Sequence, residues 1–311
     1  MKQYSSHLLM VRPSSFRKNE ETAVNNYFQA EAGLDSKVVL QQAQANFDAM
    51  VQQLRQAHIN VTVFNEPEGG DTPDALFPNN WISMHHDRRV ALYPMFAENR
   101  RRERREEVLD LLEDQGFEIE EVIDYSSAEE EGLYLEGTGS MILDHENRMA
   151  YCALSERADE DLFIEFCEDF EYTPFTFNAF QTVGEKRLKI YHTNVMMCVA
   201  DRYAVVCLEC IDDESERKQL KKHLKESGKM LIPISEAQMH QFAGNMLQVA
   251  DQNQNPVLIM SDSAYKSLTA GQIKILESFN PIVHPELGVI ETCGGGSARC
   301  MIAEIFLPKA S

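Results

Sequence analysis

The alternation of apolar and polar positions predicts one structural unit, in the order strand, strand, helix, strand, that recurs five times along the chain. Apolar residues recur at helical spacing in five segments, and in the first of these Leu40, Phe47 and Leu54 share one face. A short apolar strand, such as Val61–Phe64, follows each helix. The predicted helices are Val38–Ala57, Arg104–Gln115, Asp159–Glu171, Glu214–Ser227 and Ser263–Ser278.

A turn rich in glycine or asparagine recurs five times, each time running into an apolar strand, and successive turns lie roughly 50 to 60 residues apart. Regular repetition of this kind is typical of architectures built from equivalent units. We therefore predict one α/β domain over residues 1–311, a closed pseudo-fivefold propeller of five blades whose turns meet at one end of the central axis. The turns are Pro78–Asn80, Glu136–Gly139, His192–Asn194, Ala243–Asn245 and Gly294–Gly296.

Composition limits the classes of partner. The chain has 311 residues, of which 43% are hydrophobic, enough for a sizeable core. Its 50 acidic and 29 basic residues give a formal charge of -21, which repels nucleic acid and anionic membrane surfaces. We expect neither of these partners, and a small cationic or zwitterionic molecule fits better. No apolar run reaches the roughly 20 residues of a membrane span, and no signal region is recognised at the start. We therefore expect a cytoplasmic protein. Whether it forms a homo-oligomer is left open by the sequence.

The segment Cys293-Gly-Gly-Gly-Ser-Ala-Arg-Cys300 is the most informative stretch of the sequence. Three consecutive glycines let the backbone approach a ligand closely, and we expect a strand, Met301–Leu307, to follow. A glycine run alone is more typical of a flexible turn before a buried thiol. The seven cysteines are odd in number and lack compact spacing, so a disulfide framework is not expected and at least one thiol is free.

A cysteine nucleophile needs a base, and the base benefits from an orienting carboxylate. His192 and Glu136 lie in the equivalent turns of two other repeats. Each residue alone is more typical of a structural or surface position. Their shared place in the repeat, which matches that of the glycine run, favours a joint site with one of the two cysteines beside that run, Cys293 or Cys300.

These motifs resemble those of the guanidino-modifying superfamily, which includes arginine deiminases, dimethylarginine dimethylaminohydrolases and glycine amidinotransferases. That superfamily carries an acid-Gly-Gly-Asp turn, a His-x-Asp turn and a terminal glycine-rich segment that ends in the catalytic cysteine. Glu136–Gly139, His192–Asn194 and Cys300 follow here in the same order, and Pro73-Asp74-Ala-Leu-Phe77 resembles a further element. The resemblance is greatest to the citrulline-utilisation hydrolases. It implies a pentein propeller with Cys300, His192 and Glu136 as the catalytic set.

The chain departs from this pattern where the superfamily has acids. Asn79 and Asn80 replace a carboxylate pair, Asn194 replaces the acid of the histidine turn, and Gly139 replaces the acid that closes the glutamate turn. An asparagine amide both donates and accepts hydrogen bonds and so suits a neutral ureido group, whereas a carboxylate only accepts. We expect Asn79, Asn80 and Asn194 to contact a citrulline-like substrate. Asp74 and Glu136 could still anchor N–H groups, so arginine stays open.

The resemblance implies that the Cys300 thiolate attacks the central carbon of the substrate while His192, oriented by Glu136, protonates the departing ammonia or amine. Water then hydrolyses the covalent thio-intermediate. Arg299 is a candidate for binding a substrate carboxylate, although an arginine that points away on an alternating strand is equally compatible. The alternatives are an amidinotransferase, a dimethylarginine dimethylaminohydrolase and, in another class, a catalytically silent propeller that binds an amino acid or a protein.

Three other features are expected to carry no chemistry. Cys207-Leu-Glu-Cys210 has a C-x-x-C form but lies in a predicted strand, where residues three apart face opposite sides. The histidines show no ligand spacing, so we predict no metal, and no cofactor is expected. The run of residues 100–106 interleaves arginines with glutamates, which indicates a solvated surface.

Overall fold

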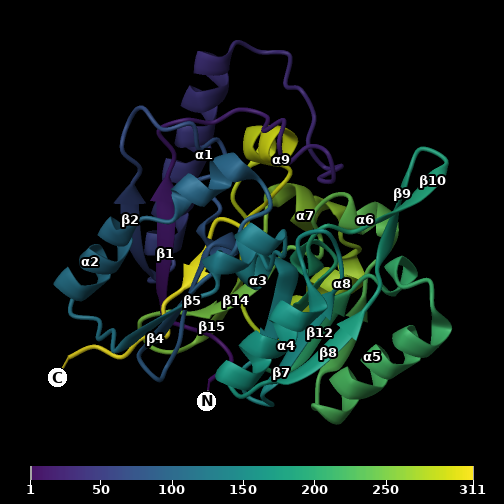
Figure 1. Ribbon diagram of the computed structural model, residues 1–311. Helices are drawn as coiled ribbons and strands as arrows, with labels where there is room; N and C mark the ends of the chain where they lie inside the picture. Colours follow the sequence, from purple (N-terminus) through teal and green to yellow (C-terminus); the bar gives the residue numbers. More distant parts are fainter. Residues whose placement is uncertain (1, 311) are drawn as a thin grey trace.

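The computed structural model describes residues 2–310, along which strands and helices alternate in an α/β fold (Figure 1). Within these residues, five three-stranded sheets share one topology, in which the central strand pairs antiparallel with one neighbour and parallel with the other. The sheets are β17 (Ala303–Glu304), β1 (His7–Arg12) and β2 (Asn60–Asn65); β3 (Ile82–Met84), β4 (Arg89–Leu92) and β5 (Glu121–Asp124); β6 (Met141–Asp144), β7 (Met149–Ala153) and β8 (Thr173–Phe177); β11 (Met197–Val199), β12 (Tyr203–Val206) and β13 (Met230–Pro233); and β14 (Leu247–Ala250), β15 (Pro256–Ile259) and β16 (Ile282–Val283).

The first sheet combines the two ends of the chain. β17 comes from the C-terminal end and pairs with β1, with Leu8 opposite Glu304. β1 pairs in parallel with β2, with Leu8 opposite Val61. The predicted unit therefore also holds for this sheet, although its first strand is the last one in the sequence.

A helix joins the central and the third strand of each sheet, as the amphipathic pattern predicted. The fifth connection differs from the prediction because Thr269 and Gln272 form a capping box that starts a second helix. The single predicted helix Ser263–Ser278 is therefore two helices. The connecting helices are α1 (Ser36–Gln56), α2 (Glu106–Asp114), α4 (Glu160–Asp169), α5 (Glu214–Glu226), α7 (Asp262–Ser267) and α8 (Ala270–Glu277).

Short helices and one hairpin complete the fold. The hairpin projects from the body of the molecule (Figure 1), and the sequence pattern did not predict it. These elements are α3 (Gly137–Ser140), α6 (Glu236–Met239), α9 (Gly288–Gly294), η1 (Pro78–Asn80), η2 (Glu98–Glu103), η3 (Ser126–Glu131), η4 (Thr193–Val195), η5 (Leu208–Cys210), and β9 (Phe180–Val183) with β10 (Lys186–Lys189).

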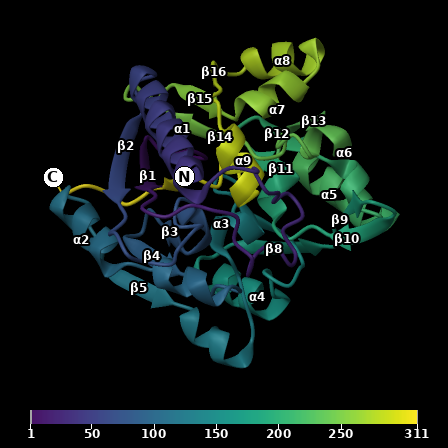
Figure 2. The same cartoon turned by 90° about the horizontal axis from the view of Figure 1, so that it is seen from above.

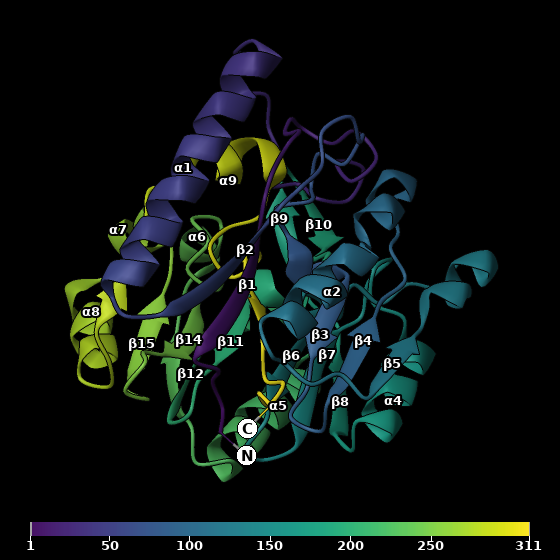
Figure 3. The same ribbon diagram turned by 90° about the vertical axis from the view of Figure 1, so that its left-hand side faces the viewer.

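The core places the terminal cysteine segment at the centre of the molecule. Seen from above, the sheets surround α3 and α9 (Figure 2). Along one side, α1 runs past β1 and β2 and reaches α9 (Figure 3). Phe47 and Leu54 of α1 pack into the same buried cluster as Cys300 and Met301. Burial of this helix face therefore also fixes the position of the cysteine segment.

Two local predictions were wrong. Only Ala303–Glu304 of the expected strand Met301–Leu307 forms β17, and Cys300 lies in the turn before it. Cys207 and Cys210 are not on opposite faces of a strand, because η5 brings their sulfur atoms within 3.1 Å of each other. Among residues 2–310, no group of three or more His, Cys, Asp or Glu side chains is arranged to hold a metal ion. No helix in the described part of the chain has both the length and the apolar character to cross a membrane.

Candidate active site

The five turns that the sequence analysis singled out meet in the middle of the molecule. Thr138 Oγ1 of the second turn donates to Asn79 O of the first, at 3.3 Å. Asn245 Nδ2 of the fourth donates to Asn194 O of the third, at 3.0 Å. The Asn79 amide, in the orientation that satisfies its neighbours, donates to Cys300 O at 2.6 Å. Residues more than 200 positions apart thus form one site around Cys300.

The Cys300 thiol is 3% exposed and faces two side-chain amides. Asn194 Nδ2 lies 3.4 Å from Cys300 Sγ, and Asn245 Nδ2 lies 3.2 Å from it. Both groups are N–H donors, and a donor stabilises the thiolate more than the thiol. Asn194 was predicted from the sequence, whereas Asn245 was noted only as part of a turn.

His192 and Glu136 form a buried, hydrogen-bonded pair in the site. His192 Nε2 lies 2.8 Å from Glu136 Oε2, and both side chains are buried. Burial lowers the pKa of His192 to about 4 despite the neighbouring Glu136, so the ring is neutral at pH 7. In that state the nitrogen facing Glu136 carries the proton, and Nδ1 holds the lone pair.

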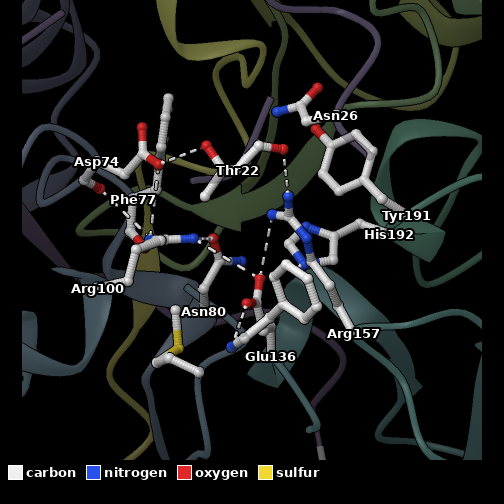
Figure 4. A network of polar contacts seen from close by, with 12 residues as sticks. Thr22, Asn26, Asp74, Phe77, Asn80, Arg100, Glu136, Arg157, Tyr191 and His192 are labelled. Atoms are coloured by element: carbon white, nitrogen blue, oxygen red, sulfur yellow. Dashed lines mark hydrogen bonds and ion pairs between the residues drawn. The ribbon is translucent and has the colours of Figure 1, made fainter. Parts of the chain in front are cut away.

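Two buried arginines flank Glu136 (Figure 4). Arg157 Nη1 lies 3.5 Å from Glu136 Oε2, and Arg100 Nη1 lies 3.7 Å from it. Burial by itself would raise the pKa of Glu136, but Arg157, the hydrogen bond from His192 and Arg100 together hold it well below its usual range. The Glu136 carboxylate is therefore ionised and already engaged by three side chains, and its Oε1 also accepts from Phe96 N at 3.0 Å.

Arg100 corrects an interpretation made from the sequence. The basic run was expected to be solvated, but η2 turns Arg100 inward, where it is 2% exposed. Its Nη1 donates to Asn80 Oδ1 at 2.8 Å, and its Nη2 donates to Glu103 at 2.9 Å. The pairing of Arg100 with Glu103 three positions later was the only sequence signal for this arrangement; Arg157 had none.

Asp74 lies at the edge of the same pocket with one oxygen free. Its Oδ2 accepts hydrogen bonds from Asn19 at 2.7 Å and from Thr22 at 3.2 Å. Its buried Oδ1 has no hydrogen-bond partner within the described residues. Burial raises the pKa of Asp74, which Arg100 only partly offsets. A free buried acceptor of this kind is suited to an N–H group of a ligand.

Glycines allow the turns to approach one another. A Cβ atom at Gly139 would lie 2.3 Å from Asn80 Nδ2 and 2.8 Å from His192 Nδ1, so no acid could stand there. A Cβ at Gly294 or Gly296 would lie 2.8 Å from the ring of Phe77. The departure at Gly139 thus makes room for the Asn80 amide, and the glycine run makes room for Phe77.

Arg299 does not share the pocket of Cys300. Its guanidinium donates to Ile302 O at 2.9 Å and lies 3.9 Å from Glu304, beside separate cavities that His145 also lines. Arg299 and Cys300, neighbours in one turn, thus line different cavities. The alternative that Arg299 points away, considered in the sequence analysis, is the one that the structure has.

The pocket itself is small. Asn26, Asp74, Arg100, Arg157, Tyr191 and Cys300 are among the residues that line a cavity of about 10 Å³, room for roughly one water molecule. The segment of residues 19–29 covers it: Asn26 Nδ2 donates to Gly294 O at 3.3 Å, and Arg157 donates to Thr22 O at 2.7 Å. The pocket as it stands is too small for an amino-acid substrate.

Comparison with known proteins places the chain in a family. The model described as "N,N dimethylarginine dimethylhydrolase, eukaryotic" matches residues 12–307. The chain belongs to this family. The match confirms the predicted superfamily and the predicted enzyme class, a hydrolase that acts on C–N bonds of guanidino compounds. No curated protein matches the chain significantly.

Solved structures of related enzymes share the fold of this member of the dimethylarginine dimethylhydrolase family. ArgZ, an arginine dihydrolase from the ornithine–ammonia cycle in cyanobacteria, is 17% identical with a TM-score of 0.74 over 98% of this chain and 41% of its own. Its N-terminal domain alone, bound to substrate, is 18% identical with a TM-score of 0.72 and is covered over 99% of its length. A dimethylarginine dimethylaminohydrolase adduct with S-methyl-L-thiocitrulline is 13% identical with a TM-score of 0.63 over 96% of this chain. The chain thus spans less than half of full-length ArgZ, and these likenesses concern the fold.

Proposed function

We propose that this protein hydrolyses a C–N bond of a ureido or guanidino amino acid through a covalent intermediate on Cys300, with a citrulline-like ureido group as the preferred substrate. The observation that supports this proposal is the shared pocket of Cys300, His192 and two buried arginines. This pocket places a nucleophile and a base beside two arginines, whose positive charges disfavour a cationic substrate.

The charge of the pocket favours a neutral reactive group. Arg100 and Arg157 bring two guanidinium groups to the pocket, and Glu136 is already engaged by both. Two like charges 4 Å apart repel by about 4 kcal/mol at an effective dielectric constant of 20. A ureido group avoids this cost, and its C=O and NH2 can pair with the amides of Asn80, Asn194 and Asn245.

The reaction follows from these positions. The neutral His192 accepts the Cys300 proton, and the thiolate attacks the ureido carbon to form a C–S bond. His192 returns the proton to the departing NH2, which leaves as ammonia with its bonding electrons. Water, activated by His192, then cleaves the C–S bond. The released carbamate loses carbon dioxide, so that citrulline and one water molecule give ornithine, ammonia and carbon dioxide.

Arg100 and Arg157 are the groups that would bind the carboxylate of the amino acid. The sequence analysis considered Arg299 for this role, but its side chain lies outside the pocket. Arg100 and Arg157 are both 2% exposed and line the pocket. An arginine fork binds a carboxylate with two parallel hydrogen bonds. We assign them this role together with their contacts to Glu136.

Dimethylarginine is the second candidate substrate, because the matching family is described by that activity. Glu136 and the free Oδ1 of Asp74 would then hold the N–H groups of its guanidinium. Hydrolysis would release dimethylamine and leave citrulline. With this substrate, the binding of the guanidinium cation would have to overcome repulsion by Arg100 and Arg157. Asn79 and Asn80 are neutral and do not offset that repulsion.

We further propose that the five sheets close into a five-bladed propeller that forms a single domain. Contacts between neighbouring sheets support it: β17 contacts β3, β6 contacts β11, and β11 contacts β14. Ala250 N of β14 also donates to Ser5 O, next to β1. A single-domain propeller should unfold in one calorimetric transition, whereas two separated transitions would contradict it.

The first experiment measures the release of ammonia from L-citrulline and L-arginine, and of dimethylamine from asymmetric dimethylarginine, with the amino-acid products identified by mass spectrometry. We expect ornithine from citrulline, and a loss of about 10⁴-fold or more in Cys300→Ala. Cys293→Ala is the matched control, because this thiol lies seven residues earlier and outside the pocket, and it should change the rate by less than about threefold.

Each product identifies one outcome. Citrulline from arginine or dimethylarginine would replace the ureido preference with a guanidino one. Turnover that survives in Cys300→Ala but is lost in Cys293→Ala would move the nucleophile to Cys293.

A further inference from the structure

The site lacks the usual partner of a reactive thiolate. A catalytic cysteine is commonly stabilised by a nearby imidazolium. Here His192 Nε2 faces Glu136 at 2.8 Å, and burial lowers the pKa of His192 to about 4, so that the ring carries no charge near neutral pH. Other groups must therefore stabilise the charge on Cys300.

Asn245 has the contacts for this task. Its Nδ2 lies 3.2 Å from Cys300 Sγ and also donates to Asn194 O at 3.0 Å. Its Oδ1 accepts from Arg299 N at 3.0 Å, directly before the cysteine. Because the oxygen is held by a backbone N–H, the amide can present only its NH2 group to the sulfur. Asn245 is completely buried.

The fourth turn is held rigidly in place. A Cβ atom at Gly244 would lie 2.4 Å from Val195 O, so the backbone of this turn packs directly against the end of η4. Asn194 of η4 places its own Nδ2 3.4 Å from the same sulfur. Asn194 and Asn245 thus occupy corresponding positions, each shortly before the first strand of its sheet, and both reach Cys300.

We propose that Asn245 is a catalytic residue that stabilises the Cys300 thiolate by a charge-assisted hydrogen bond and keeps Asn194 oriented toward the same sulfur. The inference rests on Cys300 as the nucleophile of the proposed function. It assigns chemistry to the fourth repeat, for which the sequence suggested none. It also gives the thiolate a hydrogen-bond donor that does not depend on the charge of His192.

Other ionisable groups act on the same sulfur and are common to all variants below. Arg299 precedes it in the chain, and the pocket contributes charged and polar side chains from four further segments. They are Asp74, Arg100, Arg157, Tyr191 and His192. A comparison between variants at position 245 therefore isolates the contribution of the amide.

The test is the pH dependence of Cys300 alkylation by iodoacetamide in the full-length protein, read by mass spectrometry. Trypsin cleaves after Arg299 and so places Cys293 and Cys300 on different peptides. Relative to the wild type, Asn245→Ala should shift the pH profile of Cys300 alkylation up by about one pH unit, which slows alkylation about tenfold at pH 7. Asn245→Asp should slow it further, because a carboxylate only accepts and repels the thiolate.

Asn253→Ala is the matched control, since Asn253 is an exposed residue of the β14–β15 turn, and it should titrate like the wild type. If Asn245→Asp does not fold, Asn245→Ser supplies a small hydroxyl donor and should lie between wild type and Asn245→Ala. If the pH profile of Cys300 alkylation is the same in Asn245→Ala and Asn245→Ser as in the wild type, the proposal is overturned. A failure of the proposed function has a different signature, namely a Cys300 peptide that is alkylated normally in a protein that turns over no substrate.

Discussion

Two arginine–carboxylate groups, one at Glu136 that is fully buried and one at Glu304 that is mostly buried, line different cavities beside the segment that carries Cys300, and they differ in the number of partners. On the pocket side, Glu136 faces Arg157, Arg100 and His192 within 3.7 Å. On the other side, Glu304 faces Arg299 at 3.9 Å, and its Oε1 has no hydrogen-bond partner in the described part of the chain. Burial raises the pKa of Glu304 to about 7, whereas the partners of Glu136 hold its pKa well below the usual range.

The difference shows that burial alone does not set the charge of a carboxylate. Desolvation favours the neutral acid at both positions, and the number of nearby cations and donors decides whether that preference is overcome. At Glu136 it is overcome, which supplies a fixed negative charge beside His192. At Glu304 it is not, so this group titrates near neutral pH and is suited neither to orienting a base nor to holding a fixed charge.

The largest effect should come from neutralising Glu136. Glu136→Gln keeps the size of the side chain but removes the charge that orients His192 and balances Arg100 and Arg157. We expect kcat to fall by about 10³- to 10⁴-fold, as when the acid of a catalytic triad is replaced by its amide. Glu304→Gln is the control on the other side and should change kcat by less than about threefold. Equal losses in the two variants would remove the distinction between the groups.

A smaller effect should appear in the substrate affinity, which we expect to depend on Arg157 in the pocket and not on Arg299 outside it. Arg157→Met removes a guanidinium that lines the pocket, and we expect KM for the amino-acid substrate to rise about 30- to 100-fold, the range of one lost charge-assisted hydrogen bond. Arg299→Met should leave KM within about threefold, although it removes an equally buried arginine. A larger rise of KM in Arg299→Met than in Arg157→Met would return the carboxylate role to Arg299.

The smallest effect concerns stability against pH. The folded pKa of Glu304, about 7, lies above the ordinary value of 4.5, so the folded state binds more protons between these two values. The contribution of Glu304 to the free energy of unfolding therefore falls as pH rises from about 4.5 to 7.

Urea unfolding of wild type and Glu304→Gln at pH 5 and pH 8 measures this contribution. We expect the wild type to lose about 1 to 3 kcal/mol more than the variant between these pH values. A parallel loss in both proteins would show that Glu304 ionises normally in the fold. Glu103, whose pKa burial also raises, to about 8, is present in both proteins and cancels in the difference.

Local patterns in the sequence predicted most of the fold. The helix from residue 38 to 57 was predicted within two residues of its end points, because its apolar stripe and its Asp35 cap are both local features. The prediction of a single fifth helix was wrong. The apolar stripe continues through Thr269, and only the capping box there shows that one helix ends and a second begins. The prediction of a strand over Met301–Leu307 was also wrong, because pairing with β1 extends over only two residues.

The sequence by itself determined the repeated unit and the turns at residues 79, 136, 192, 245 and 295, and it predicted a thiol, a base and an acid for one site. These depend on residue type and spacing, which a chain displays without folding. Only the tertiary structure decided that Arg100 and Arg157 enter the pocket while Arg299 leaves it, and that Asn245 reaches the sulfur. Direction and burial of a side chain depend on what packs against it from distant segments, and no local pattern contains that information.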